Sequence, residues 1–414
     1  MTNLQITAPF QVCASIALPA SKSISNRALV IAALCGGRPQ VLHPALCDDT
    51  EVMIDALNRK GNDISINVGA AGTAMRFLTS YFATREGVTV TLDGTERMRQ
   101  RPIGPLVDAL RSMGADITYL GEQGFPPLRI RGKILHGGDV AMPGGVSSQF
   151  VSAVMMILPV VGGGTIHLTG DIVSEPYIHM TAAVMRQMGG QAEITGSTIS
   201  VGSGYIGHDC HVEADWSAAA PWYALAALLP DSSLTLKGLQ PDSIQGDARL
   251  AQLASQLGIA TRFDSCGAML DTSRFIGCCC SCFADMAATP DLALSWTVLL
   301  CLLERSFRMT GVRTLRLKES DRLHALRQEL LKLGYVLKIE GEDAISWYGE
   351  RVPVTQELPV IDTHGDHRMA MAFAPAAVRF PGLTITDADV VSKSYPNFWR
   401  HLEMAGFNLN RMER

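Results

Sequence analysis

Six glycines recur along the chain, each after a stretch whose apolar residues have helical spacing: Gly61, Gly114, Gly189, Gly258, Gly334 and Gly406. Successive members of this set are 53, 75, 69, 76 and 72 positions apart. Glycine often ends a helix because it adopts the left-handed backbone conformation without steric cost. One such glycine would mean little, but six in phase predict a sixfold α/β repeat.

Each repeat has the same internal order of elements. A small polar loop leads into a helical stretch rich in Ala, Leu and Met, and a short strand follows it. The helical stretches begin near Ser21, Gly72, Ser147, Asp215, Pro290 and Asp366. The predicted strands cover residues 40–43, 88–92, 165–169, 233–237, 307–310 and 383–386. A second helical stretch then runs to the glycine, and a further strand follows nearly every glycine.

The number of repeats determines the predicted domain organisation. Six repeats in 414 residues are too many for one hydrophobic core, so we expect two domains of three repeats each. The predicted boundaries lie near Pro19 and Lys237. They give one domain of residues 20–237 and another that combines residues 1–19 with 238–414. The first strand, residues 4–18, could pair with the C-terminal half.

The composition indicates a globular protein without a nucleic-acid or membrane partner. Hydrophobic residues make up 47% of the chain, and the net charge of −5 argues against a general nucleic-acid binder. The first nine residues lack a basic start followed by an apolar run, so no secretory signal is expected. The apolar stretches at 151–161 and 292–303 are shorter than the roughly 18 residues that span a bilayer. We therefore expect a cytoplasmic protein.

Ten cysteines are present, and Cys278, Cys279, Cys280 and Cys282 stand together. The paired spacing of a zinc site is absent, so reduced thiols are a better interpretation than a metal site. The sequence also has no Walker-type loop and no acidic cluster for Mg²⁺, which argues against ATP-dependent chemistry. We expect neither a metal nor a cofactor.

Basic residues stand near predicted helix starts, although the partial charge of a helix start is already positive. They are Lys22, Arg27, Arg76, Arg101, Arg322, Arg368 and Lys393. Any one of them alone would be an ordinary surface charge. Their recurrence in several repeats predicts a cleft for a ligand with several phosphate or carboxylate groups, because a bound anion would neutralise side chains and helix ends together.

Three acidic residues occupy comparable junctions. Beside an anionic ligand a carboxylate is repulsive unless it moves a proton or orients a hydroxyl group. Helix capping is the alternative for Asp49 and Asp291, and we predict the cap for Asp49. Glu319 lies between Lys318 and Arg322 in the segment Lys-Glu-Ser-Asp-Arg, and for Glu319 we predict a chemical role.

Ten segments, in order along nearly the whole chain, resemble the motifs of the 5-enolpyruvylshikimate-3-phosphate synthase family. They are residues 18–27 (LPASKSISNR), 71–76 (AGTAMR), 97–103 (RMRQRPI), 147–150 (SSQF), 174–177 (SEPY), 245–247 (QGD), 290–291 (PD), 318–322 (KESDR), 366–371 (DHRMAM) and 393–396 (KSYP). Together these motifs are highly specific.

The resemblance implies the enolpyruvyl transferase fold, an α/β fold of two inside-out, barrel-like domains with three βαβαββ units each. It implies a cofactor-free monomer that acts in the sixth step of the shikimate pathway to chorismate. The enolpyruvyl (carboxyvinyl) group of phosphoenolpyruvate would move to the 5-hydroxyl of shikimate 3-phosphate. The reaction would pass through a tetrahedral intermediate and release phosphate.

The family's site residues carry over position by position. Those implied to bind shikimate 3-phosphate are Lys22, Ser23, Arg27, Ser147, Ser148, Gln149, Ser174, Tyr177, Asp291, Thr314 and Lys318. Those implied to bind phosphoenolpyruvate are Lys22, Gly72, Arg101, Gln149, Arg322, Arg368 and Lys393. For catalysis the resemblance implies Glu319 as proton donor to C3 of phosphoenolpyruvate and Asp291 as base toward the hydroxyl, assisted by Lys22 and His367. Nothing in the sequence fixes which carboxylate performs which step.

The chain departs from the family pattern at several positions. Ala70 replaces a usual Asn, Phe77 a common Pro, and Thr314 an Asn that often binds substrate. Further departures are Ala214, Trp216 and Gly365. The charged groups that the chemistry requires are retained. The resemblance implies that the family's inhibitor glyphosate is accommodated if the space beside Gly72 is open, and Phe77 bears on this sensitivity.

Three other functions are alternatives to this interpretation. A UDP-N-acetylglucosamine enolpyruvyl transferase shares the fold and the donor, but that family has a reactive Cys in the loop that corresponds to residues 97–102, and this chain has none there. A non-catalytic sensor of phosphorylated metabolites would not need the opposing carboxylates Asp291 and Glu319. RNA 3′-phosphate cyclase has related units, but its ATP and RNA chemistry finds no support in this sequence.

Overall fold

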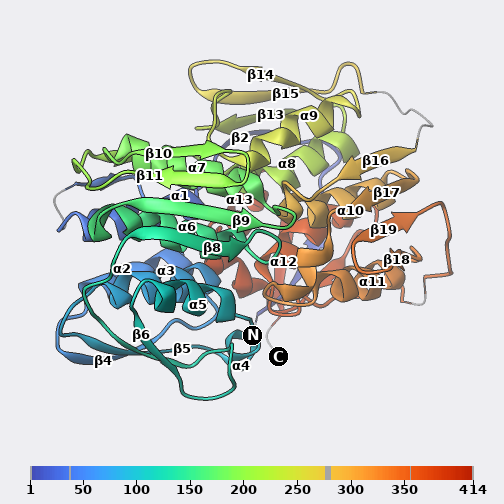
Figure 1. The fold of residues 1–414 in the computed structure, drawn as a ribbon. Helices are drawn as coiled ribbons and strands as arrows, with labels where there is room; N and C mark the ends of the chain where they lie inside the picture. Colours follow the sequence, from blue (N-terminus) through green and yellow to red (C-terminus); the bar gives the residue numbers. More distant parts are fainter. Residues whose placement is uncertain (1, 37–38, 276–280, 355, 413–414) are drawn as a thin grey trace. The chain divides into compact units, whose positions relative to one another are not determined.

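The computed structural model describes residues 2–36, 39–275, 281–354 and 356–412, so Cys278, Cys279 and Cys280 lie outside the described residues. The chain forms two compact units (Figure 1). Unit 1 combines Met1–Pro19 with Glu213–Arg414, and unit 2 is Ala20–Val212. None of the described helices is long and apolar enough to cross a bilayer.

Unit 2 alternates helices with short strands. Its helices are α1 (Lys22–Leu34), α2 (Asp48–Asn58), α3 (Gly72–Ala83), α4 (Glu96–Arg99), α5 (Gly104–Ser112), α6 (Ser148–Ile157), α7 (Glu175–Gln187) and the 3-10 helix η1 (Leu158–Val161). Its strands are β3 (Val41–Leu42), β4 (Asp63–Asn67), β5 (Thr89–Asp93), β6 (Asp116–Tyr119), β7 (Leu128–Arg131), β8 (Gly138–Pro143), β9 (Gly164–Thr169), β10 (Ala192–Thr195), β11 (Thr198–Val201) and β12 (Cys210–His211).

Unit 1 has the same alternation, with several helices that begin or end as 3-10 turns. Its helices are α8 (Trp216–Leu228), η2 (Gly246–Arg249), α9 (Leu250–Ser255), η3 (Pro290–Leu292), α10 (Ala293–Leu302), η4 (Arg313–Leu317), α11 (Arg322–Lys332), α12 (His367–Phe373), η5 (Ala374–Val378), η6 (Ala388–Lys393) and α13 (Phe398–Met404). Its strands are β1 (Asn3–Thr7), β2 (Cys13–Ala17), β13 (Ser233–Lys237), β14 (Ala260–Phe263), β15 (Gly267–Asp271), β16 (Cys282–Asp285), β17 (Phe307–Thr310), β18 (Lys338–Glu340), β19 (Ala344–Trp347), β20 (Val360–Ile361), β21 (Leu383–Ile385) and β22 (Asn408–Met412).

One sheet topology recurs through the part of the chain that the structure describes. Five sheets have four strands, and in each of them one pair at an edge of the sheet is parallel and the other two pairs are antiparallel. Their orders are β4-β5-β7-β6, β10-β11-β9-β8, β14-β15-β13-β2, β16-β17-β19-β18 and β20-β21-β1-β22. The sheet of the first repeat contains only β3 and β12 among the described residues. The six predicted strands that follow the first helix of each repeat are confirmed as β3, β5, β9, β13, β17 and β21.

The N-terminal strands belong to unit 1, although unit 2 follows them in the chain. β1 pairs with β21 and β22, and β2 pairs in parallel with β13. Pairing of the N-terminal segment with the C-terminal half is thus confirmed, with two strands in place of the single strand predicted for residues 4–18. The compact units divide after Val212, whereas the predicted boundary is near Lys237. The reason is that β13 has strands of unit 1 on both sides, β2 and β15.

The six periodic glycines all have positive φ angles, between 83° and 130°. Each follows a helix by one to three residues, as the sequence predicted. Gly334 shows why glycine is needed: its φ is +85°, and a Cβ atom there would lie 2.7 Å from the carbonyl oxygen of Val352. The glycine therefore permits both the left-handed turn after α11 and the close approach of the next segment.

The central helices of each unit are buried on nearly all sides. In α8, twelve of the thirteen residues are buried, and α10 and α12 pack against it. In unit 2, α3 and α6 pack together with α1, and most of their residues are buried as well. The strands instead alternate between buried and exposed residues, as in β9 and β13. Helices therefore fill the centre of each unit and sheets cover them, which is the predicted inside-out arrangement.

We expect Gly334→Ala to destabilise the protein more than the matched control Gly341→Ala. Both glycines have positive φ, but the space around Gly341 is open, so alanine there costs only the left-handed strain of about 1 kcal/mol. At Gly334 the clash with Val352 adds to that strain and roughly doubles the loss of unfolding free energy. Chemical denaturation of both variants measures this difference, and equal losses would contradict the role given to Gly334.

Candidate active site

The buried guanidinium of Arg322, the first residue of α11, binds three carboxylates in unit 1. Its Nε donates to Oδ2 of Asp366 at 2.7 Å and its Nη1 to Oδ1 of Asp291 at 2.8 Å. Its Nη2 donates to Oε2 of Glu319 at 3.0 Å. Arg322 is only 1% exposed, so these bonds lie in a desolvated environment, where unpaired charges would be costly.

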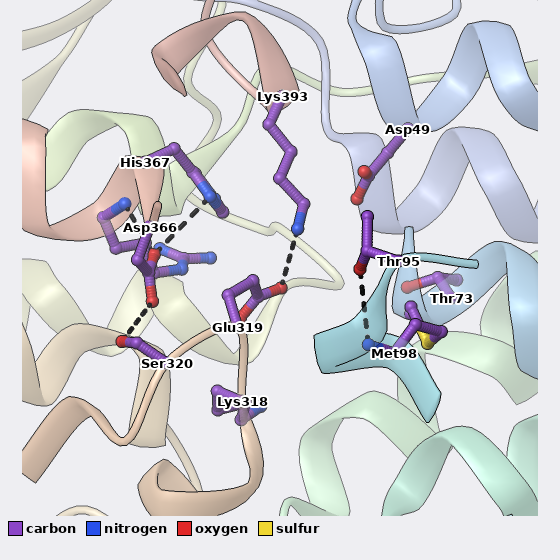
Figure 2. A network of polar contacts seen from close by, with 12 residues as sticks. Asp49, Thr73, Thr95, Met98, Lys318, Glu319, Ser320, Asp366, His367 and Lys393 are labelled. Atoms are coloured by element: carbon purple, nitrogen blue, oxygen red, sulfur yellow. Dashed lines mark hydrogen bonds and ion pairs between the residues drawn. The ribbon is translucent and has the colours of Figure 1, made fainter. Parts of the chain in front are cut away.

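Three further cations surround the same carboxylates. Lys318 Nζ lies 3.5 Å from Oδ1 of Asp291, and Arg368 Nη2 lies 3.2 Å from its Oδ2. Lys393 Nζ lies 3.5 Å from Oε1 of Glu319, toward which its side chain extends in Figure 2. Four basic side chains thus lie around three carboxylates. Basic side chains gathered in this way favour binding of an anion.

Local chain geometry positions these groups. Asp366 is the N-cap of α12, and its Oδ1 accepts a hydrogen bond from the backbone N of Arg368 at 2.9 Å. Ser320 and His367 flank the same carboxylate in Figure 2: Ser320 Oγ donates to it at 3.4 Å, and His367 Nδ1 lies 3.6 Å away. Asp366 therefore fixes the start of α12 and the position of Arg322 at once.

The pKa values of two acids follow from this environment. Burial alone would raise the pKa of Asp291, but the charges of Arg368, Lys318 and Arg322 outweigh burial and hold it well below its usual range. Burial, reinforced by the charge of Asp291, raises the pKa of Asp247 to about 6. Asp247 accepts a hydrogen bond from Ser217, while its Oδ1 is buried without a partner among the described residues. Asp291 is therefore held as a carboxylate, and Asp247 titrates near neutral pH.

Unit 2 holds a second basic cluster, on α1. Lys22 opens this helix and its Nζ forms an ion pair of 2.9 Å with Oδ2 of Asp49. The predicted capping role of Asp49 is wrong: the N-cap of α2 is Cys47, and Asp49 instead neutralises Lys22, 27 residues earlier in the chain. Arg27, one turn after Ser23, donates to its carbonyl oxygen at 2.8 Å and is almost completely buried.

The loop before α3 meets the segment of residues 97–103, here called the arginine loop, at Gly72. A Cβ atom at Gly72 would lie 2.6 Å from Nη1 of Arg101, so the guanidinium of Arg101 rests directly against this glycine. Only a residue without a side chain permits that contact, and the space beside Gly72 is filled by Arg101. Gln149 Nε2 donates to Thr73 Oγ1 at 3.3 Å, which brings the start of α6 to the same loop. Arg76 donates to the carbonyl oxygens of Gly72 and Pro102 and fixes both segments.

Comparison with known proteins identifies the family to which these residues belong. Residues 6–66 and 59–402 match the family model of EPSP synthase (3-phosphoshikimate 1-carboxyvinyltransferase). The chain belongs to the EPSP synthase family. It is 48% identical over 408 residues to a 3-phosphoshikimate 1-carboxyvinyltransferase of Bacteroides fragilis (strain YCH46), with 98% of each chain covered. It is 36% identical to one of Methanospirillum hungatei, with 94% of this chain and 95% of the relative covered.

A solved structure confirms the predicted fold class. The EPSP synthase structure from Acinetobacter baumannii matches all of this chain and is itself matched over its full length, with a TM-score of 0.75 and 21% sequence identity. The enolpyruvyl transferase fold implied by the family resemblance is therefore correct.

The structure gathers the predicted EPSP synthase site residues within each unit. In unit 1 one ion network contains Asp291, Lys318, Glu319, Arg322, Arg368 and Lys393. Thr314 lies in η4, and its Oγ1 is buried without a hydrogen-bond partner among the described residues. In unit 2 the predicted residues lie at the starts of α1, α3, α6 and α7 and in the arginine loop: Lys22, Ser23, Arg27, Gly72, Arg101, Ser147, Ser148, Gln149, Ser174 and Tyr177.

Three further residues of the candidate site have no role predicted from the sequence. Ser320 and Asp366 contact one another and Asp366 binds Arg322, and the charge of Asp291 acts on Asp247 in the Gln-Gly-Asp segment. The position of Asp366 directly before a helix that begins with His367 and Arg368 could have indicated its role as a helix cap beside basic residues. Asp366 completes the charge balance of Arg322, a residue 44 positions away in the chain.

Asp247→Asn should change how the stability of the protein depends on pH. The pKa of Asp247 is raised from 3.8 to about 6 on folding, so the folded state binds a proton more tightly than the unfolded state. This group therefore lowers the unfolding free energy as the pH rises from about 4 to about 6, by up to about 1.4 kcal/mol per pH unit. The Asn variant lacks that decrease.

Urea denaturation between pH 4 and pH 7 measures the effect. Asp242→Asn, a matched change at a nearby exposed aspartate, is the control and leaves the pH dependence as in the unmodified protein. If both variants keep the decrease between pH 4 and pH 6, Asp247 is not the group that titrates there.

Proposed function

We propose that the chain transfers the enolpyruvyl group of phosphoenolpyruvate to the 5-hydroxyl of shikimate 3-phosphate and releases phosphate. Its EPSP synthase activity in the shikimate pathway follows from membership of the family over nearly the whole chain. That single observation carries the proposal. The acids and bases gathered around Arg322 support it, because the reaction needs anion binding and proton transfer together.

Two sets of residues are proposed to bind the substrates. Shikimate 3-phosphate is assigned to Lys22, Ser23, Arg27, Ser147, Ser148, Gln149, Ser174 and Tyr177 in unit 2 and to Asp291, Thr314 and Lys318 in unit 1. Phosphoenolpyruvate is assigned to Lys22, Gly72, Arg101 and Gln149 in unit 2 and to Arg322, Arg368 and Lys393 in unit 1. The guanidinium of Arg322 donates four of its five N–H groups to three carboxylates, so phosphoenolpyruvate would meet the remaining Nη1–H or displace one of these carboxylates.

Glu319 is the proposed proton donor to C3 of phosphoenolpyruvate. Protonation makes C2 electrophilic, and the 5-hydroxyl attacks C2 and gives its proton to the base. Phosphate then leaves the tetrahedral intermediate and takes up that proton, while C3 returns a proton to Glu319. Lys393, 3.5 Å from Glu319, stabilises the carboxylate that Glu319 forms between the two steps. Proton transfer of this kind contributes roughly 10²–10⁴-fold to the rate.

Asp291 is the proposed base toward the 5-hydroxyl, with Lys22 and His367 assisting. Its low pKa makes it a weak base as long as Arg368, Lys318 and Arg322 face it. An anionic substrate that pairs with Lys318 and Arg368 removes part of this influence, so the pKa of Asp291 rises when substrate binds. The base would then become effective only in the complex.

We also propose that the protein is a monomer, that it acts in the cytoplasm and that it uses no cofactor. Within the described residues, no group of three or more His, Cys, Asp and Glu side chains is arranged to hold a metal ion.

UDP-N-acetylglucosamine is the acceptor that most needs testing as an alternative. We expect phosphate release from phosphoenolpyruvate when shikimate 3-phosphate is added and none when UDP-N-acetylglucosamine is added. The missing Cys in residues 97–102 argues against the second acceptor. Phosphate release with the sugar nucleotide alone would overturn the proposal, and binding of both ligands without release would favour the non-catalytic sensor.

Glu319→Gln should lower kcat about a hundredfold, because the amide keeps the shape of the side chain and cannot give up a proton. Asp321→Asn is the matched control in the same segment, since this residue caps α11 and an asparagine caps equally well. The control should keep kcat within about twofold. A near-normal kcat in Glu319→Gln would rule out proton transfer by this residue.

A further inference from the structure

Arg27 is a buried cation whose partners are neutral. Its Nε donates to Thr181 Oγ1 at 2.7 Å, and its Nη2 donates to Ser152 Oγ at 3.1 Å and to the carbonyl oxygen of Tyr177 at 3.4 Å. Together with the bond to the Ser23 carbonyl, these account for at most four of the five guanidinium N–H groups. Over the described ranges no acidic side chain bonds to Arg27, in contrast to Arg322 with its three carboxylates.

Two aromatic rings stand beside this guanidinium. The ring centroid of Phe77 on α3 lies 5.3 Å from Cζ of Arg27, and that of Tyr177 on α7 lies 5.9 Å from it. Phe77 is completely buried and Arg27 is 2% exposed. A cation over an aromatic face is stabilised most strongly in a desolvated environment of this kind.

The difference between a ring and a carboxylate matters for an anion site. A carboxylate would neutralise Arg27 and would repel an approaching anion. An aromatic ring stabilises the cation through its quadrupole and carries no net charge, so the positive charge stays available to the ligand. Burial lowers the pKa of Arg27 to about 10, and the guanidinium therefore remains charged at neutral pH.

We propose that Phe77 is a positioning residue for the shikimate 3-phosphate site: its ring holds the charged guanidinium of Arg27 in the orientation in which it meets the anionic substrate. The inference rests on the proposed function, which assigns Arg27 to this substrate. It also gives a role to a residue that replaces a common proline in this chain, because proline offers no aromatic face.

Steady-state kinetics of Phe77→Leu tests the inference. Leucine keeps the position apolar and removes the aromatic face, so KM for shikimate 3-phosphate should rise roughly three- to tenfold. KM for phosphoenolpyruvate and kcat should stay within about twofold, because Arg27 is assigned to one substrate only. Phe82→Leu is the matched control: Phe82 is buried in the same helix but stands against Tyr81 rather than a cation, and its replacement should leave both KM values unchanged.

A double-mutant cycle with Arg27→Gln distinguishes the role of Phe77 from the assignment of Arg27 to shikimate 3-phosphate. Arg27→Gln should itself raise KM for shikimate 3-phosphate, and adding Phe77→Leu should then have no further effect. If Arg27→Gln leaves this KM unchanged, the assignment of Arg27 in the proposed function is wrong. If Arg27→Gln raises it and Phe77→Leu does not, the role of Phe77 is wrong and the proposed function stands. Should Phe77→Leu fail to fold, Phe77→Met, which is closer in volume, takes its place.

Discussion

The ion network around Arg322 is the interaction on which unit 1 depends. A guanidinium that is 1% exposed must be compensated, and three carboxylates from three separate segments do so. Each carboxylate also has a second function: Asp366 caps α12, Asp291 binds Lys318 and Arg368, and Glu319 faces Lys393. The same contacts therefore hold the chain segments together and position the acids and bases to which we assign the enolpyruvyl transfer.

Two of the buried arginines, Arg27 and Arg322, illustrate two ways of keeping a cation inside a protein. Arg322 is balanced by negative charge and fixes the positions of three carboxylates. Arg27 is surrounded by hydroxyl groups, carbonyl oxygens and aromatic rings, so its charge is stabilised but not cancelled. The first arrangement orders acids around the cation, and the second keeps the positive charge of the cation available to an anion.

Much of the fold could be predicted from the sequence because the relevant signals are local. The helix starts, the glycines that end the second helices and the strands between them each depend on a few neighbouring residues. The division between the units could not be placed in this way, because it depends on β13 pairing with β2, which lies more than 200 positions earlier. The N-terminal segment likewise forms two strands, separated by residues 8–12, where the sequence predicts one.

In the candidate site, too, contacts between residues distant in the chain could not be predicted from the sequence. The motifs contain the charged residues that form the ion network of unit 1, but several of their partners are distant in sequence. Asp49 looked like a helix cap because its ion pair with Lys22 cannot be seen from neighbouring residues. Asp366 had no assigned role because its partner Arg322 belongs to another segment. Local sequence patterns thus indicate which charged residues belong to the candidate site, and only the fold shows which of them form ion pairs.

The position of β1 and β2 has a consequence for biosynthesis. These strands are translated before unit 2, whereas β13, β21 and β22, with which they pair, are translated only after the whole of unit 2. The N-terminal segment must therefore wait with open strand edges, and such edges can associate with other chains. The described strands of unit 2 pair only with one another, so unit 2 can assemble during this interval. Unit 1 can be completed only after the C-terminal strand β22 has emerged, because β1 lies between β21 and β22 in their sheet.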